Sequence, residues 1–448
     1  MGAHNVSDWQ KLPLSLSELC IETTLRCGQS FRWRKINDEW HCVLRGRIIS
    51  LKQDASHLHY KVTWPNYAPG LLTSPVSMSS ACAPTLKDND SDAEKDDTYS
   101  LLHSYFALSH PLSSLYTQWA ASDTNFARRA PAFTGIRILN QDAWEALVAF
   151  ICSSNNNISR ISQMVQKLCI HYGPYIGTIE GEPFHDFPGP EALLGSHVES
   201  HLRHLGFGYR AKYIAETACI LSKFKPAGWL LQLRNPACPA FDVLGEKYGT
   251  PDIKAAAGPA TYRAAHDALL ELPGVGPKVA DCVCLMGLGW GEAVPIDTHV
   301  WQIAQRDYSF GKGSKTKTLN KAMYDAVGDH FRSLWGTQAG WAQSVLFTAN
   351  LKSFAEQASA VKPESGVKVT KAESAAMVYE PASADPEAAL VRFEENREPA
   401  IAKTNSRTRK RAVTTAKVSV ESNTKVAETS QVEVCTRRRS KRIKAAAS

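Results

Sequence analysis

One lysine in this chain directly follows a turn whose composition suits a phosphate group. The turn is Gly274-Val275-Gly276, and Pro277 and Lys278 come next. The two glycines permit positive φ and leave backbone N–H groups open to an anion, and proline suits the first position of a helix. Free N–H groups and the positive end of that helix attract phosphate. The pattern indicates a phosphate-binding turn, although an ordinary Gly/Pro loop before a buried helix has the same composition.

Lys278 and Asp297 carry the two groups that could do chemistry beside this turn. A lysine in the first helical turn opposes the helix dipole, which disfavours its charged form. A neutral amine is a nucleophile that can form a Schiff base with a sugar carbon. Asp297 precedes an apolar helical pattern that starts at Thr298, so it is typical of a helix N-cap. A carboxylate held in this way can stabilise positive charge on a sugar as a base departs. A solvated lysine and a plain cap are the competing interpretations.

Four further segments carry distinctive motifs. They are residues 28–33 (GQSFRW), 150–160 (FICSSNNNISR), 205–211 (LGFGYRA) and 340–347 (GWAQSVLF). Together with residues 272–301, they resemble the eukaryotic 8-oxoguanine DNA glycosylases of the helix-hairpin-helix superfamily, in that family's order. The resemblance extends, with interruptions, from about residue 14 to residue 351. It implies that Lys278 displaces the oxidised base and forms an imine, and that Asp297 assists both steps.

The resemblance also implies a pocket for the damaged base. Gly28 would offer its backbone carbonyl to the N7 proton that 8-oxoguanine has and guanine lacks. One such contact can discriminate, because an unpaired buried acceptor costs about 1–3 kcal/mol. Gln343 would bind the Watson–Crick edge, which needs both a donor and an acceptor. Phe347 and Cys282 would enclose the flipped base between them.

The DNA contacts implied by the resemblance come from four segments. They are Asn155, Arg160, Tyr209, Arg210, Gly274, Val275, Gly276 and His299. Asn155 would fill the space that the base vacates, and Tyr209 would wedge the base stack. Arg160 and Arg210 would contact the orphaned cytosine, and His299 would contact a phosphate.

Several of these residues have simpler explanations. Phe347 lies in an apolar helical run, which favours core packing, and Cys282 is by default an inert buried thiol. Tyr209 and Arg210 follow a Gly-x-Gly turn and could be surface residues. The three asparagines that begin at Asn155 are poor helix formers, yet they fall within a helical pattern over residues 144–168. A local rule broken within an element often marks function.

The composition excludes several classes of protein. The 448 residues allow two or three domains, and a hydrophobic share of 44% is enough for a buried core. No run of about 18 apolar residues suggests a membrane span, and no signal or transit peptide is evident. The 11 cysteines include no C-x-x-C pair, so neither an iron–sulfur cluster nor a zinc site is expected. We therefore expect an intracellular protein without a metal or cofactor. The resemblance implies that it acts on duplex DNA, and we expect it to be a monomer.

The chain divides into parts by pattern. Alternating apolar and aromatic residues between about 15 and 65 predict strands, and helical patterns extend from about residue 142 to 352. The resemblance implies an α+β fold, in which an antiparallel sheet domain similar to the TATA-binding protein packs on a helical helix-hairpin-helix domain. The expected domains are 1–132 with an acidic loop near 84–98, 133–354, and a disordered tail at 355–448. Two segments, 236–261 and 311–321, depart from the family pattern.

The end of the chain carries its basic excess. Residues 401–448 hold 13 Lys and Arg against 3 Asp and Glu, a net charge of +10, whereas the whole chain is at +7, so residues 1–400 are at −3. The clusters at 406–411 and 437–444 are typical of nuclear import signals or of a non-specific DNA-binding arm. A merely solvated tail is the simpler alternative. We expect nuclear localisation, with a mitochondrial form as an open alternative.

The sequence thus predicts a base-excision repair enzyme. It would excise 8-oxoguanine opposite cytosine and cleave the abasic strand by β-elimination through an imine on Lys278. One alternative keeps this chemistry but acts on another oxidised or alkylated base. A second alternative is a non-catalytic helix-hairpin-helix DNA-binding protein, and the pairing of Lys278 with Asp297 argues against it.

Overall fold

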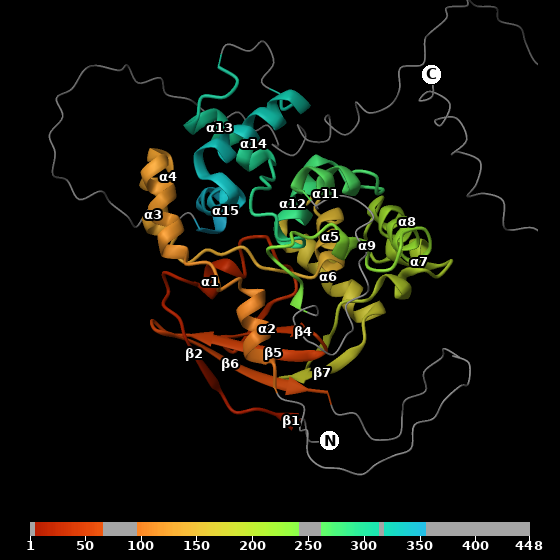
Figure 1. Cartoon of the computed structure of the whole chain (residues 1–448). Coiled ribbons are helices and arrows are strands. Elements are labelled where there is room, and N and C mark those ends of the chain that lie inside the picture. The colour runs from red at the N-terminus through yellow and green to blue at the C-terminus, as the bar shows by residue number, and fades with distance from the viewer. Residues whose placement is uncertain (1–4, 66–95, 242–260, 313–317, 355–448) are drawn as a thin grey trace, which may run out of the picture. The chain divides into compact units, whose positions relative to one another are not determined.

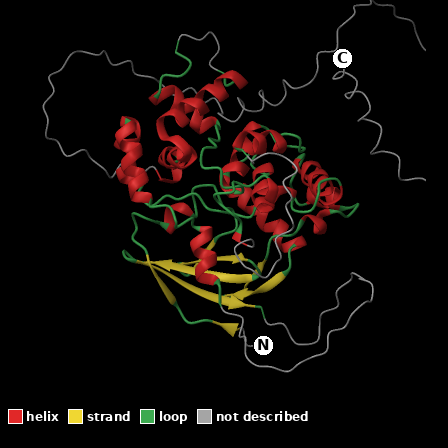
Figure 2. Cartoon of the chain, viewed as in Figure 1, coloured by secondary structure: helices red, strands yellow, loops and turns green. Residues whose placement is uncertain are grey.

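An antiparallel sheet and a larger group of helices make up the described part of the chain (Figure 1). The computed structural model describes residues 5–65, 96–241, 261–312 and 318–354. Figure 2 shows the yellow strands grouped below the red helices. The predicted α+β fold is therefore confirmed. The predicted tail at 355–448 lies outside the described residues, as do most of the acidic loop at 84–98 and most of the segment at 236–261.

The main sheet is built from the N-terminal part of the chain. Its strands are β1 (Asn5–Val6), β2 (Gln10–Pro13), β3 (Arg34–Ile36), β4 (Glu39–Leu44), β5 (Arg47–Gln53) and β6 (His57–Trp64). They pair antiparallel in the order β1-β6-β5-β4-β3, and β2 also pairs with β6. Two-residue turns join β3 to β4 and β4 to β5, and all four of their central residues have positive φ. These are Asn37, Asp38, Arg45 and Gly46. Such turns match the right-handed twist of paired strands.

Two helices pack close to this sheet in one apolar core. They are α1 (Ile21–Thr24) and α2 (Thr98–Tyr105). Leu101, Leu102 and Tyr105 of α2 are buried in the same cluster as Ile49 and Leu51 of β5. The sheet therefore has a core that is separate from the larger core of the helices.

The remaining elements form the helical part. They are α3 (Leu112–Ser122), α4 (Thr124–Arg129), η1 (Ala130–Ala132), α5 (Ala143–Ile151), α6 (Ile158–Tyr172), β7 (Tyr175–Ile179), β8 (Glu182–His185), η2 (Pro190–Leu193), α7 (Val198–His204), α8 (Arg210–Lys223), α9 (Trp229–Gln232), α11 (Tyr262–Leu269), α12 (Pro277–Met286), α13 (Thr298–Asp307), α14 (Lys321–Trp335), η3 (Gly336–Gln338), α15 (Ala339–Asn350) and η4 (Lys352–Phe354). Helices α5 and α12 pack against each other in the middle of this part. Among the described helices, none has the length and apolar character that a membrane crossing requires.

The predicted domain boundary at residue 132 does not follow the apolar cores. Helices α3 and α4 precede that boundary, yet they pack against α14 and α15, and Trp119 and Phe126 are buried in the helical core. The region predicted to be helical also contains the β7–β8 hairpin, which lies against the main sheet. These contacts are made with side chains that are far away in the sequence. The local pattern of apolar residues therefore could not predict them.

The helical pattern predicted over residues 144–168 belongs to two helices and not to one. Helix α5 ends at Ile151, and α6 starts after Asn157, whose side chain accepts a hydrogen bond from the Arg160 N–H. Asn155 has a positive φ of 46° in the loop between them. Asparagine is among the few residues that tolerate this conformation and is a good N-cap. The asparagine run is therefore the break between two helices.

Candidate active site

The phosphate-type turn joins α11 to α12 in a helix-hairpin-helix arrangement. Gly274 has a φ of 75°, and a Cβ at this position would lie 2.5 Å from the Tyr213 ring. Gly276 is extended, with a φ of −97°, so only the first glycine uses positive φ. Val275 is buried, and its N–H donates to the Leu272 carbonyl at 3.3 Å. The Val275 N–H thus has a partner within the turn, and the phosphate contacts of Gly274, Val275 and Gly276 stay predictions.

Lys278 lies in the first turn of α12, directly after Pro277. Its Nζ donates to the Ser153 hydroxyl at 3.1 Å and lies 5.4 Å from the centre of the Phe150 ring. The Ser153 hydroxyl in turn donates to the Phe150 carbonyl at 2.7 Å, which leaves its lone pairs for the lysine. Two groups at the end of α5 thus orient the amine.

Asp297 is the N-cap of α13, as predicted. Its carboxylate accepts a hydrogen bond from the Val300 N–H at 2.9 Å. This hydrogen bond fixes the direction of the Asp297 side chain.

All six residues predicted for catalysis and base binding line one cavity of about 60 Å³. They are Gly28, Lys278, Cys282, Asp297, Gln343 and Phe347. They come from the loop after α1, from α12, from the start of α13 and from α15. Typical ligand cavities hold about 300 Å³ or more, so this one must widen to admit a purine base.

The side chains of the cavity wall differ in burial and in their contacts. Gln343 is buried, whereas Phe347, one turn later on the same face of α15, is half-buried. The Phe347 ring lies 5.7 Å from the His299 ring. His299 also lies 3.5 Å from the Asn350 amide. Burial raises the pKa of Cys282 to about 11, which the nearby Lys278 only partly offsets. Cys282 is therefore a neutral thiol near pH 7.

Gly28 has a φ of 86°, and its neighbour Gln29 anchors it. The Gln29 amide donates to the Arg137 carbonyl at 2.7 Å and accepts from the Leu139 N–H at 2.9 Å. Its backbone carbonyl accepts from the Gln141 amide at 2.8 Å. These bonds tie the loop after α1 to the segment before α5. The position of the Gly28 carbonyl therefore depends on both parts of the fold.

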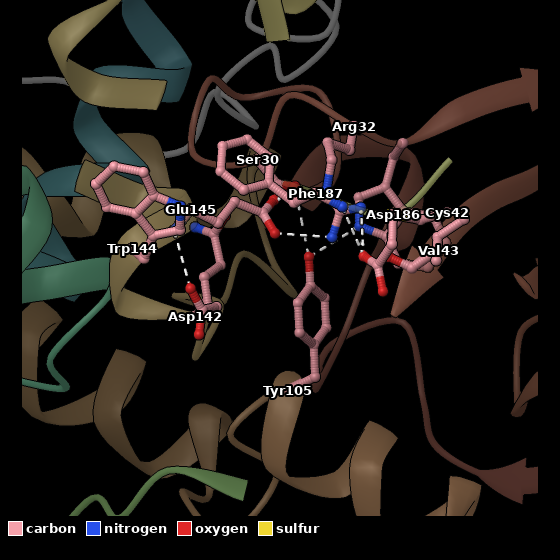
Figure 3. A network of polar contacts seen from close by, with 12 residues as sticks. Ser30, Arg32, Cys42, Val43, Tyr105, Asp142, Trp144, Glu145, Asp186 and Phe187 are labelled. Carbon is pink, nitrogen blue, oxygen red and sulfur yellow. Dashed lines mark hydrogen bonds and ion pairs between the residues drawn. The ribbon is translucent and has the colours of Figure 1, made fainter. Parts of the chain in front are cut away.

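Arg32 fixes the other end of the same loop, as Figure 3 shows. Its guanidinium binds the Glu145 carboxylate at 2.7 and 2.9 Å and Asp186 at 3.1 Å. Asp186 follows β8 and also accepts from the Gly46 N–H in the β4–β5 turn at 2.9 Å. The Arg32 side chain is only 6% exposed, so its two carboxylate partners offset the large cost of burying its charge. The network joins the sheet, α5 and the β7–β8 hairpin.

Three of the predicted DNA contacts meet at the loop between α5 and α6. Tyr209 is 43% exposed and donates to the Ser154 carbonyl at 3.1 Å. Arg210 is buried, and its guanidinium donates to the carbonyls of Ser154 and of Asn155, the latter at 2.9 Å. Asn155 itself is exposed, and so is Arg160 on α6. In this arrangement Arg210 supports the loop, and contact with a cytosine would require these bonds to open.

Sequence reasoning missed the rest of the cavity wall. The further lining residues are Cys27, Gln29, Phe150, Met286, Pro295, Val300, Ser344 and Thr348. Helical spacing was the available signal, because Met286 lies one turn after Cys282, and Thr348 one turn after Ser344. Ser153 was missed as well, since nothing local connects it to a lysine on another helix.

Comparison with known proteins agrees with this site. Residues 11–147 match the family model "8-oxoguanine DNA glycosylase, N-terminal domain", and residues 148–326 match "HhH-GPD superfamily base excision DNA repair protein". The chain is 36% identical to the N-glycosylase/DNA lyase of Saccharomyces cerevisiae over 364 residues, which cover 76% of this chain and 86% of that protein. This chain belongs to the 8-oxoguanine DNA glycosylase family. A relative from Arabidopsis thaliana, N-glycosylase/DNA lyase OGG1, is 35% identical over 77% of this chain and 80% of its own length.

The fold of this glycosylase also matches solved structures. The structure of MBOgg1 in complex with a low-affinity DNA ligand aligns with a TM-score of 0.56, covering 78% of this chain and 98% of that one at 23% identity. The two family models meet at residues 147 and 148, inside α5. Within the described ranges of the glycosylase, no group of three or more His, Cys, Asp or Glu could hold a metal ion.

Proposed function

We propose that this chain is a bifunctional DNA glycosylase and AP lyase that removes 8-oxoguanine opposite cytosine from duplex DNA. It then cleaves the abasic strand by β-elimination through an imine on Lys278. The family and its curated relatives support the pair of activities. The observation that carries the proposal for this chain is that the Lys278 amine and the Asp297 carboxylate line the same cavity as Gly28, Cys282 and Gln343.

The chemistry needs one amine and one carboxylate. As a neutral amine, Lys278 attacks C1′ of the flipped nucleotide, and the glycosidic bond breaks with its electron pair leaving on the base. The Asp297 carboxylate stabilises the positive charge that develops on the sugar. Opening of the sugar ring at O4′ leaves an imine between C1′ and Nζ. Loss of a C2′ proton then expels the 3′ phosphate, and water hydrolyses the imine.

The other groups of the cavity would select the base. The Gly28 carbonyl would accept the N7 proton of 8-oxoguanine, and guanine would leave that carbonyl without a partner, at a cost of about 1–3 kcal/mol. Cys282 suits a contact with a neutral base, because its raised pKa keeps it uncharged. Stacking on Phe347 would recover part of the few kcal/mol that base flipping costs.

Borohydride trapping tests this proposal directly. The full chain is incubated with a duplex that carries one 8-oxoguanine opposite cytosine, beside an undamaged duplex, and the imine is reduced to a stable amine. We expect a covalent adduct with wild type and with Lys35→Gln, a control on β3, and none with Lys278→Gln.

The outcomes separate the alternatives. An adduct with DNA that carries a different damaged base, but not with DNA that carries 8-oxoguanine, would support the imine mechanism and show that the substrate is another lesion. Tight binding to the lesion without an adduct or strand cleavage would point to a non-catalytic DNA-binding protein. An adduct that persists in Lys278→Gln would assign the nucleophile to another residue.

We also propose that the protein acts as a monomer in the nucleus. The support for nuclear localisation is the pair of basic clusters at 406–411 and 437–444, which lie outside the described residues. Clusters of this kind are typical of import signals.

A further inference from the structure

Asp281 is a buried carboxylate that the proposed chemistry does not use. It lies on α12, three residues after Lys278, and is 1% exposed. One oxygen accepts from the Tyr262 hydroxyl and the other from the Tyr324 hydroxyl, each at 2.5 Å. The His266 ring lies 3.8 Å from the first oxygen. The carboxylate therefore joins α11, α12 and α14 in the interior.

The Tyr324 hydroxyl makes one further contact. The Ile296 N–H donates to it at 3.4 Å, and Ile296 directly precedes Asp297 in the chain. A phenol can donate and accept at the same time, so both bonds can exist together. Tyr262 is also buried and binds the same carboxylate, but within the described residues it has no hydrogen bond to the segment before α13 that contains Ile296.

We propose that Tyr324 is a positioning residue for the reaction, and this rests on the function proposed above. Its hydroxyl couples α12, which carries Lys278, to the backbone beside Asp297, and so sets the distance between amine and carboxylate. Asp297 is then held from both sides, because the Val300 N–H binds its carboxylate. A hydrogen bond between a hydroxyl and a carboxylate is short and charge-assisted, so the coupling to α12 is stiff. Displacing a reacting group by about 1 Å can cost about a hundredfold in rate.

Two matched variants test this role. Tyr324→Phe and Tyr262→Phe each remove one hydroxyl from the Asp281 carboxylate, but only Tyr324→Phe also removes the bond to Ile296. We expect a loss of melting temperature in both, and a somewhat larger one in Tyr324→Phe, because that variant also leaves the Ile296 N–H without a partner. We expect the single-turnover excision rate to fall about tenfold in Tyr324→Phe alone. The Kd for a duplex with a tetrahydrofuran abasic analogue should stay within about twofold of wild type, because the base-flipping and phosphate contacts are unchanged.

Several results would overturn the proposal. Equal rates in the two variants, whether both normal or both reduced, would show that Tyr324 has no role beyond holding Asp281. Weaker binding of the abasic analogue at a normal rate would make Tyr324 a binding residue. Fast hydrogen exchange at the Ile296 amide of the wild type would show that its hydrogen bond to the Tyr324 hydroxyl is not formed. This measurement tests the proposal even if Tyr324→Phe does not fold. A wild-type protein that is inactive on this DNA would reject the proposed function, and the positioning role with it.

Discussion

Gly28 combines a backbone conformation with a position on the cavity wall. Its φ of 86° lies in the left-handed region, where a side chain is disfavoured. A Cβ there would also lie 2.8 Å from the Ile158 Cδ1 atom at the start of α6. Gly181, in the β7–β8 turn, has a similar φ of 81°, but a Cβ there would meet nothing within 4 Å. The two glycines share the conformational demand and differ in surroundings.

We expect Gly28→Ala to lose excision rate and Gly181→Ala to keep it. Each variant should lose about 1 kcal/mol of unfolding free energy, because alanine is strained at positive φ. Gly28→Ala must also move Ile158 or its own carbonyl, and a lost hydrogen bond to the base would slow excision about tenfold. Single-turnover rates and urea denaturation measure both effects. A normal rate in Gly28→Ala would contradict the role of its carbonyl.

At the level of elements, one side chain near α1 caps a helix of the other core. The Glu18 carboxylate accepts from the N–H groups of Leu112 and Ser113 at the start of α3, at 2.8 and 2.9 Å. It also binds the guanidinium of Arg137 at 2.7 Å, and the Arg137 side chain is only 1% exposed. The N-terminal N–H groups of α3 and a buried charge are thus satisfied by one remote residue.

We expect Glu18→Gln to destabilise the fold in a pH-dependent way. Burial alone would raise the pKa of Glu18, but hydrogen bonds from Ser113 and Leu112 and the charge of Arg137 outweigh it, so this pKa lies below its ordinary value of 4.5. The ionised group therefore stabilises the fold above about pH 4.5, and this contribution is lost as the pH falls through the folded-state pKa.

Urea denaturation at pH 7 and at pH 4 measures this effect. Glu18→Gln should cost about 2 kcal/mol at pH 7, because it removes charge-assisted bonds, and less at the lower pH. Glu271→Gln is the control, because that side chain is 63% exposed in its pair with Lys225 and should change stability by less than about 0.5 kcal/mol. A cost for Glu18→Gln that does not vary with pH would show that its charge is irrelevant.

At the level of the whole chain, charge is divided unevenly. Residues 401–448 carry +10, whereas residues 1–400 carry −3. Attraction to the phosphate backbone grows with the number of cations that contact it, and it weakens as salt rises. The basic excess of the chain is therefore separate in sequence from the residues of the cavity.

We expect removal of residues 401–448 to reduce the salt dependence of DNA binding without changing excision. The slope of log K against log salt should become shallower by about 4.5, if about half of the ten cations in the two clusters contact phosphate. The single-turnover rate at saturating protein should stay at the wild-type value. A matched variant of full length, with Gln for each Lys and Arg of 406–411 and 437–444, should behave like the truncation. An unchanged slope would argue against a DNA-binding tail.

Local features of this protein follow from the sequence alone. The cap at Asp297, the start of α12 at Pro277 and the positive φ of Gly274 each depend on neighbours within a few residues. Such features obey short-range rules of geometry and hydrogen bonding, so residue types in order are enough to predict them. The six cavity residues are far apart in the sequence, so local rules could not group them. They were predicted from the resemblance of the motifs to a known family.

The contacts between distant segments were decided by the tertiary structure. The pairing of Arg210 with the loop at Asn155, the Lys278–Ser153 bond and the bridge from Asp281 through Tyr324 all join separate elements. The break between α5 and α6 and the packing of α3 on the C-terminal helices are of the same kind. Which side chains meet depends on how the helices pack, and packing is a property of volumes and surfaces that no local pattern contains.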